Sequence, residues 1–289
     1  MSFKIITDSC ANLTHGQISE YGVEVVSLTY TVGDKEYLGY IPGEDPDYRA
    51  FYDMLRKKEH VKTSLVSYGR VEKAIYTALS AGEDVLYLAF SSALSGTCQI
   101  VRNCAADLLE QFPDRKITVV DTLCASMGQG LLVKYAVDKQ REGLSLEETA
   151  EWVEANKLRL AHLFTVDDLF FLKRGGRVSG ATAVMGTLLG IKPLLHVDDN
   201  GKLVSYGKIR GRKASIDAVI ARMGELGENL SEQEIFIAHA DCEEDALYAA
   251  EKVKELYGVP SVKINYIDPV IGSHSGPGTF ALFFMGKNR

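Results

Sequence analysis

The chain has 289 residues, a length that suits two domains of ordinary size. Hydrophobic residues make up 46% of it and charged residues 25%, as expected of a globular protein with a large core. The formal net charge of −7 argues against bulk binding of nucleic acid and against broad electrostatic attraction to a membrane. No apolar run approaches the ~18 residues that a membrane span requires, so we expect no stable membrane insertion.

The chain begins with a predicted strand, without the basic stretch and long apolar run of a signal peptide. Its five cysteines are odd in number and form no C-x-x-C pair, which indicates reduced thiols in a cytoplasmic protein. Its six histidines are scattered without ligand spacing. We therefore expect neither a metal site nor a cofactor.

The first half alternates short apolar runs, which predict strands, with stretches in which apolar residues recur at helical spacing. This order indicates a mostly parallel, Rossmann-like α/β sheet. Ser145 and Glu148 fit a capping box at the start of the last helix. The predicted strands cover 4–7, 23–30, 85–90 and 117–120; the helices cover 48–58, 69–81, 98–110, a stretch through 131–136, and 147–160; loops cover 37–46 and 61–67.

The second half mixes hairpins with helices, which indicates a smaller α+β domain. Residues 198–201 form a strong turn signal between two predicted strands. We therefore predict two domains, 1–159 and 160–289. The predicted elements are a helix through 169–172 that ends in a basic, glycine-containing segment, strands at 191–196, 203–209, 235–239, 262–266 and 279–285, helices at 214–226 and 243–257, and a glycine-rich loop at 272–278.

Four hydroxyl groups lie in the turn 91–97, between a buried strand and a helix. Gly96 lets a ligand approach the backbone, and the turn presents free N–H groups at the positive end of a helix dipole. This arrangement favours a phosphate or carboxylate site. Alternatively, a hydroxyl of the turn only caps the helix. The four hydroxyls belong to Ser91, Ser92, Ser95 and Thr97.

Two further predicted strands run into polar turns, at 8–12 and 121–126. In an open parallel sheet the carboxyl ends of the strands line one edge, where ligands bind. Three such turns on a common edge predict a polar ligand site there.

Four segments stand out together with Asp8 and Ser9, and their order resembles the DegV family of bacterial fatty-acid-binding proteins over essentially the whole chain. The segments are 61–64, 91–97, 172–179 and 271–278. The sequence departs from the family pattern at Asn12, often Asp, at Leu65 and Val66, usually Gln-Pro, and at Cys98, usually aromatic. We expect these departures to affect the lining of the pocket more than its polar head.

The resemblance implies a tunnel between the two domains that holds one long-chain fatty acid, with its carboxylate on Thr63 and Ser95. A separate fatty acid kinase would phosphorylate that carboxylate, and the acyl phosphate would feed phospholipid synthesis. The protein would thus present a substrate and not be an enzyme itself. Arg174 and His274 would support the transfer or the docking of the kinase. Supporting positions would be Asp8, Ser9, Ser92, Gly96 and Thr97.

The residues fit this chemistry. Hydroxyl and backbone N–H groups hold a carboxylate without neutralising it, so it stays nucleophilic. A guanidinium such as that of Arg174 matches phosphate oxygens, and His274, on its glycine-rich loop, suits donation to developing charge. In the alternative reading, the basic segment is a solvated helix end, His274 is structural and Thr63 caps a helix.

A serine hydrolase is the rival hypothesis, with Ser95 as nucleophile and His274 and Asp8 or Asp121 as partners. The turn lacks the G-x-S-x-G pattern of a nucleophile elbow, which argues against it. A nucleotide-hydrolysing enzyme is weaker still, because the sequence has no G-x-x-x-x-G-K-[ST] motif.

Overall fold

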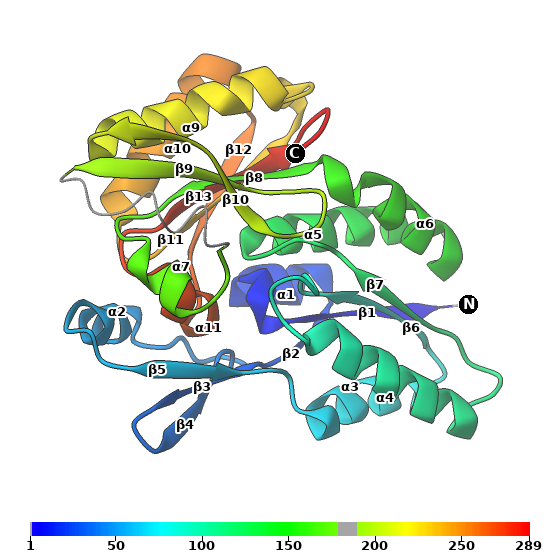
Figure 1. The fold of residues 1–289 in the computed structure, drawn as a ribbon. Coiled ribbons are helices and arrows are strands. Elements are labelled where there is room, and N and C mark those ends of the chain that lie inside the picture. The colour runs from blue at the N-terminus through cyan, green and yellow to red at the C-terminus, as the bar shows by residue number, and fades with distance from the viewer. Residues whose placement is uncertain (1, 179–189) are drawn as a thin grey trace.

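The computed structural model describes residues 2–178 and 190–289, so the last residue of the predicted basic segment, Ser179, lies outside the described residues. Their strands form three sheets, of four, six and three strands. In Figure 1 the four-stranded sheet lies at the right, the six-stranded sheet above it and the three-stranded sheet at the lower left. None of the helices within these ranges is long and apolar enough to cross a membrane.

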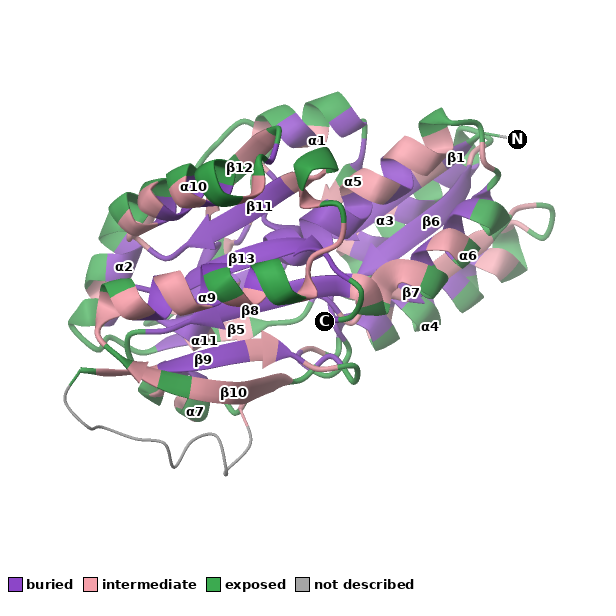
Figure 2. Cartoon of the chain, turned by 90° about the horizontal axis from the view of Figure 1, so that it is seen from above, coloured by how far each residue is buried: buried purple, intermediate pink, exposed green. Residues whose placement is uncertain are grey.

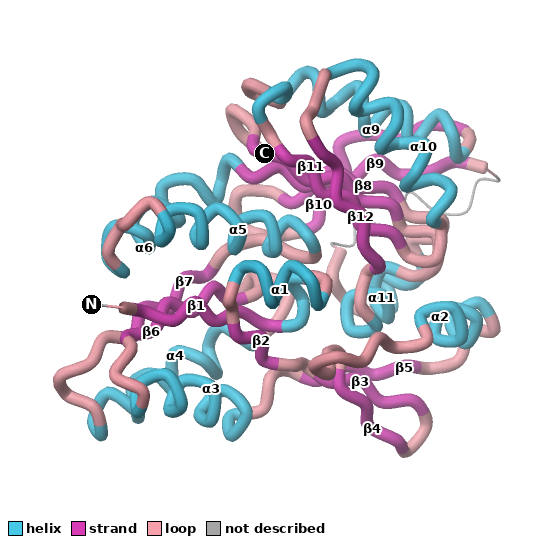
Figure 3. The backbone as a smooth tube through the Cα atoms, turned by 180° about the vertical axis from the view of Figure 1, so that it is seen from behind, coloured by secondary structure: helices cyan, strands magenta, loops and turns pink. Residues whose placement is uncertain are grey.

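The four-stranded sheet is parallel throughout, with the order β2-β1-β6-β7. Helices α3 and α4 cover one face, and α1, α5 and α6 lie on the other (Figure 3). All six residues of β6 are buried, as expected for the centre of a doubly covered sheet. The strands are β1 (Phe3–Asp8), β2 (Glu24–Val26), β6 (Asp84–Ala89) and β7 (Ile117–Asp121); the helices are η1 (Ser9–Ala11), α1 (His15–Tyr21), α3 (Tyr68–Ser80), α4 (Thr97–Gln111), α5 (Met127–Arg141) and α6 (Leu146–Asn156).

The six-stranded sheet is mixed, with the order β10-β9-β8-β13-β11-β12, and only β11 and β12 pair in parallel. Helices α9 and α10 cover its outer face (Figure 1). Figure 2 shows β8, β11 and β13 buried beneath helices whose outward faces are exposed. The strands are β8 (Leu160–Thr165), β9 (Ile191–Val197), β10 (Leu203–Arg210), β11 (Glu234–His239), β12 (Ser261–Tyr266) and β13 (Phe280–Met285); the helices are η2 (Lys157–Arg159), α7 (Phe170–Arg174), α9 (Arg212–Leu226), η3 (Leu230–Glu232), α10 (Glu243–Tyr257) and α11 (Pro269–Ser275).

The predicted fold class is confirmed: a mostly parallel α/β sheet is followed by an α+β part. The capping box of Ser145 and Glu148 and the hairpin of β9 and β10 are also confirmed. The boundary between residues 159 and 160 stays a prediction; it falls where η2 leads into β8.

A small antiparallel sheet was not predicted. It consists of β3 (Thr29–Val32), β4 (Lys35–Leu38) and β5 (Val61–Ser64), and with α2 (Tyr48–Arg56) it forms a unit that we call the arm. The single strand predicted over 23–30 was wrong, because the chain leaves the parallel sheet at Leu28. There the Leu28 N–H donates to Ser9 Oγ (3.0 Å) and its carbonyl accepts from Gly39 N (2.8 Å).

Helix α1 was not predicted, and two further differences lie in the second half of the chain. Strand β8 was missed because His162 interrupts an otherwise apolar run, although all six of its residues are buried. The loop predicted at 272–278 is wrong in its first half, where α11 runs to Ser275. This helix begins with Pro269 after the N-cap Asp268, whose carboxylate accepts hydrogen bonds from two main-chain N–H groups.

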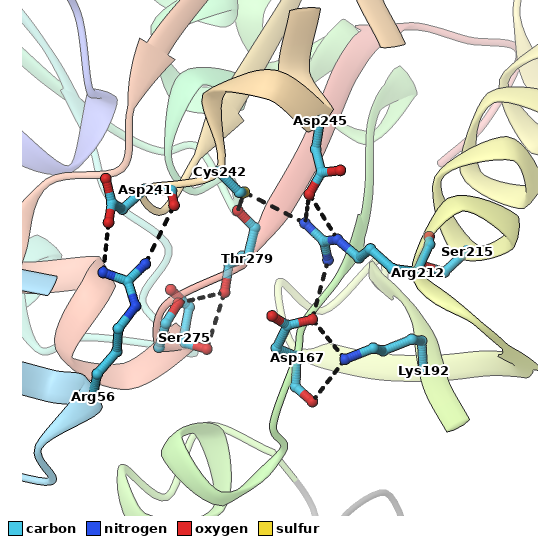
Figure 4. A network of polar contacts seen from close by, with 11 residues as sticks. Arg56, Asp167, Lys192, Arg212, Ser215, Asp241, Cys242, Asp245, Ser275 and Thr279 are labelled. Atoms are coloured by element: carbon cyan, nitrogen blue, oxygen red, sulfur yellow. Dashed lines mark hydrogen bonds and ion pairs between the residues drawn. The ribbon is translucent and has the colours of Figure 1, made fainter. Parts of the chain in front are cut away.

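The arm is clamped to the C-terminal half by α2. Tyr48, Tyr52 and Arg56 are spaced four residues apart and therefore lie on one face of the helix. Their partners lie at or just after the carboxyl ends of β11 and β12. Tyr48 stacks on Tyr266 with ring centroids 4.5 Å apart, Tyr52 Oη donates to Ile267 O (2.7 Å), and Arg56 pairs with Asp241 (2.5 Å; Figure 4).

Helix α5 packs closely on the turn after β1, and Gly130 makes this possible. A Cβ at Gly130 would lie 2.6 Å from the carbonyl oxygen of Ala11. We expect Gly130→Ala to lower the free energy of unfolding by roughly 1–3 kcal/mol, because the main chain has to shift. Urea unfolding of the ligand-free protein measures this.

Gly69→Ala is the matched control, since no atom lies within 4 Å of a Cβ there and Gly69 is inside α3. It should stabilise the protein by about 0.5–1 kcal/mol. Equal effects of the two substitutions would contradict the close packing of α5.

Candidate functional site

A cavity lies where the edge of the parallel sheet, the arm and the six-stranded sheet meet. The space between its walls, open mouth included, is about 870 Å³. Both halves of the chain supply its walls, as predicted for a tunnel between them. Most of its lining is apolar and includes Phe90, Leu94, Phe164, Leu172, Ile271 and Phe283.

Both predicted carboxylate ligands line this cavity. Thr63 lies on β5, and Ser95 lies in the turn before α4. His274 lines it too, from the last turn of α11, and its Nε2 is 2.8 Å from Thr63 Oγ1. The structure thus brings together three residues that are far apart in the sequence. Thr63 does not cap a helix, because it is a strand residue and the N-cap of the next helix is Ser67.

The Ser95 hydroxyl does not cap α4 in the usual way. The N-cap is Gly96, which has no side chain for a cap. Ser95 Oγ lies 3.0 Å from Thr97 Oγ1 and accepts a hydrogen bond from Thr97 N (3.3 Å). A Cβ at Gly96 would lie 3.3 Å from Leu65, so the turn abuts the end of β5. Ser95 therefore lies near a helix N-terminus and lines the cavity.

The imidazole of His274 is held tightly and is neutral at pH 7. Burial lowers the pKa of His274 to about 4, and the positive charges of Arg177 and Arg174 add to this. Its Nδ1 packs against Gly175, where a Cβ would lie only 2.2 Å away. The expectation of a loop was therefore wrong for His274, which lies on a packed helix.

The basic segment after α7 places two arginines differently. The Arg174 guanidinium lies over the rings of Phe170 and Phe171 and is not part of the cavity wall. Arg177 does line the cavity, and its Nε donates to Leu94 O (3.3 Å). Burial lowers the pKa of Arg177 from its ordinary value.

The sequence reasoning assigned a role to Arg174 and missed Arg177. The signal that could have found it is Gly176, whose φ of +70° reverses the chain after α7. Arg177 then lines the cavity, whereas the Arg174 guanidinium lies against the rings of Phe170 and Phe171 and 3.5 Å from Ser273 O of α11.

Asp8 and Ser9 lie beneath the site and do not line it. Asp8 accepts hydrogen bonds from Cys10 N (3.1 Å) and Phe90 N (2.8 Å), and burial raises the pKa of Asp8 to about 7. Ser9 accepts from Leu28 N where the chain turns toward the arm. Both residues hold strand ends in place.

The hairpin turn between β9 and β10 packs on the carboxyl edge of the parallel sheet, near Ser91. Ser91 Oγ donates to Gly201 O (3.0 Å). Ser92 is exposed, and its main-chain N–H donates to Asp121, which also accepts from Leu123 N. The predicted common edge is confirmed, but this turn covers the part of it near Ser91.

Asn12 explains one departure from the family pattern. Its amide donates to Asp268 (2.9 Å) and its carbonyl oxygen accepts from Ser126 Oγ (2.8 Å). A carboxylate at position 12 would lack the donor. Burial raises the pKa of Asp268 to about 6, so a second carboxylate there would add repulsion. Of the departing positions, only Leu65 lines the cavity.

The geometry does not support a serine hydrolase. Ser95 bonds to Thr97, and His274 to Thr63. Asp8 and Asp121 are engaged with main-chain N–H groups, and neither bonds to His274. The nucleophile–base–acid relay of such an enzyme is therefore not assembled. In the part of the chain that the structure describes, no cluster of His, Cys, Asp or Glu could hold a metal ion.

We expect His274 to titrate far below an ordinary histidine in an NMR pH titration of the ligand-free protein, with a pKa of about 4. The unfolded chain would bind this proton near pH 6.5, so the unfolded state holds more protons between these values. His274 therefore lowers stability as the pH falls from about 6.5 to about 4.

Arg177→Met should raise the pKa of His274, because it removes a nearby positive charge. Arg222→Met on α9 is the control and should leave that pKa unchanged. A midpoint near pH 6.5 in the unmodified protein would show that the ring is not desolvated.

Comparison with known proteins places the chain in a family. A family model described as "Uncharacterised protein, DegV family" matches residues 2–287. A DegV domain-containing protein of Clostridium perfringens is 44% identical over 287 residues, covering 99% of this chain and 98% of that protein. A DegV domain-containing protein of Lactococcus lactis is 37% identical and covers 99% of each chain.

Solved structures agree with this. The DegV family protein of Thermus thermophilus, a fatty acid binder, has a TM-score of 0.88 and 30% identity, covering 99% of this chain and all of that one. DegV of Bacillus subtilis, a fatty-acid-binding protein, has a TM-score of 0.83 and 28% identity, with coverage of 99% and 100%. This chain belongs to the DegV family.

Proposed function

We propose that this protein binds one long-chain fatty acid in the cavity, with the carboxylate on the hydroxyls of Thr63 and Ser95. The observation that carries the proposal is an apolar cavity in which these two hydroxyls lie beside a neutral imidazole and a guanidinium. The DegV proteins of Thermus thermophilus and Bacillus subtilis are fatty-acid-binding proteins, which supports the same ligand class here.

Burial of the acyl chain would supply most of the affinity. Each buried CH₂ contributes about 0.8 kcal/mol, so a long chain contributes on the order of 10 kcal/mol before the cost of ordering it. The hydroxyls and the N-terminus of α4 would mainly fix the position and direction of the ligand.

A ligand carboxylate that is held by hydroxyl groups stays nucleophilic and can therefore be phosphorylated. In our proposal a separate fatty acid kinase uses ATP: a carboxylate oxygen attacks the γ-phosphorus, the bond from that phosphorus to the bridging oxygen breaks, and acyl phosphate and ADP result. The acyl phosphate would feed phospholipid synthesis. The protein itself would present the substrate and would not be an enzyme.

Arg177 and Arg174 have different roles in this proposal. Arg177, in the cavity wall, would meet negative charge that develops during transfer. Arg174 lies outside, beside the half-exposed ring of Phe170, which suits contact with the kinase. The five free cysteines, four of them buried, fit the reducing cytoplasm, where ATP is available.

Extraction of the purified protein followed by lipid mass spectrometry tests the ligand. We expect a stoichiometric long-chain fatty acid, and Ser95→Ala should weaken its binding by ~1.5–3 kcal/mol, the value of one hydrogen bond to a charged group. Ser92→Ala is the control, because Ser92 is exposed and does not line the cavity. Absence of any fatty acid, or ester turnover that Ser95→Ala abolishes, would refute the proposal.

Arg174→Ala and His274→Ala should retain bound fatty acid yet lose most acyl-phosphate formation with the kinase and ATP. For His274 the reason is that charge beside the acceptor oxygen grows only during phosphoryl transfer, and for Arg174 it is the loss of a contact with the kinase. Kinase binding to each variant then separates docking from chemistry. Full phosphorylation of both variants would contradict this prediction and would show that the two residues have only a structural role.

A further inference from the structure

The cavity meets the solvent beside the end of β5. Of the described residues that line the cavity, only Ser64 and Leu65 are exposed, and all the others are half-buried or buried. Leu65 is 41% exposed, although it is a large apolar residue. Because these two residues border both the cavity and the solvent, they form the rim of the cavity in the described part of the chain.

Leu65 reaches across this rim to the turn before α4. Its Cδ1 and Cδ2 atoms lie 3.3 and 3.7 Å from the position that a Cβ at Gly96 would take. Gly96 directly follows Ser95, and Leu65 comes two residues after Thr63. The isobutyl group therefore joins the two chain segments that carry the proposed carboxylate hydroxyls.

The main chain on both sides of Leu65 is anchored. Ser64 belongs to β5, which pairs with β3 in the arm. Val66 is buried, and the side chain of Ser67 caps α3. Leu65 is thus held between a strand and a helix, and its place over Gly96 is set by the fold of the arm.

An apolar side chain at the rim has two effects on a carboxylate that lies on Thr63 and Ser95. It offers that carboxylate no hydrogen bond, but it keeps away water, which competes for the two hydroxyls. It also provides apolar contact for the first CH₂ groups of the acyl chain. Both effects oppose the departure of the ligand past the rim.

We propose that Leu65 retains the fatty acid: its side chain closes the rim over the carboxylate end of the cavity and sets the rate at which the ligand leaves. This inference rests on the proposed binding of a fatty acid to Thr63 and Ser95. It gives the departure from the family pattern at Leu65 a consequence, because a glutamine there would place a polar amide at the rim.

Displacement kinetics test this. Delipidated protein is loaded with the fluorescent cis-parinaric acid and mixed rapidly with excess palmitic acid, and the fall in fluorescence gives the dissociation rate. We expect Leu65→Ala to release the probe about fourfold to fifteenfold faster, the effect of losing contact with about one or two CH₂ groups. Leu65→Gln should also release it faster, because its amide draws water to the rim. Leu65→Met keeps an apolar side chain of similar volume and should stay within about twofold of the unmodified protein.

Leu247→Ala is the matched control. Leu247 is 50% exposed, lies on α10 and does not line the cavity, so the same truncation there should leave the dissociation rate unchanged. Thermal unfolding of the ligand-free variants checks their folding. Both alanine variants should have a nearly unchanged Tm, since truncation of an exposed side chain has little effect on stability.

The outcomes separate this inference from the proposed function. A probe that binds, but leaves Leu65→Ala at the rate of the unmodified protein, would overturn the role of Leu65 alone. Equal acceleration in Leu247→Ala would also overturn it, because the effect would not come from the rim. Failure of both cis-parinaric and palmitic acid to bind would overturn both proposals.

Discussion

The contact between Thr63 Oγ1 and His274 Nε2 joins two segments 211 residues apart, and the candidate site depends on it. Thr63 reaches this position only because the arm leaves the parallel sheet at Leu28 and is clamped to the C-terminal half by one face of α2. The cavity is therefore a product of the way the arm docks on α11. Neither half of the chain could form it alone, since the apolar walls come from both.

Electrostatics then decides what the cavity can hold. Burial keeps His274 neutral at pH 7, so the ring beside the Thr63 hydroxyl carries no charge. A carboxylate there would be hydrogen-bonded without being locked in a buried ion pair, which would be harder to break. Arg177 supplies one positive charge at the cavity wall, where the hydrogen bond from its guanidinium to the main-chain carbonyl of Leu94 restrains it.

The sequence was most informative where structure is local. The strand ends, the hydroxyl turn with Ser95 and the capped helices follow from short patterns, and the structure contains them. The arm escaped prediction because β5 reads as a polar segment and becomes a strand only by pairing with β3, about thirty residues earlier. The placement of Arg177 depends on a chain reversal at Gly176, which spacing alone does not show.

The glycine-rich segment around His274 shows why composition misled. Gly272 accommodates the Tyr52 hydroxyl of the arm, which a Cβ would approach to 2.5 Å, and Gly276 accommodates the ring of Phe171, at 2.4 Å. In the sequence these glycines suggested a loop. In the structure each leaves the space in which an aromatic ring packs against α11. Because this packing holds the helix from two sides, His274 is fixed before a ligand arrives. A preorganised site loses less entropy on binding, so rigidity here contributes to affinity as well as to selectivity.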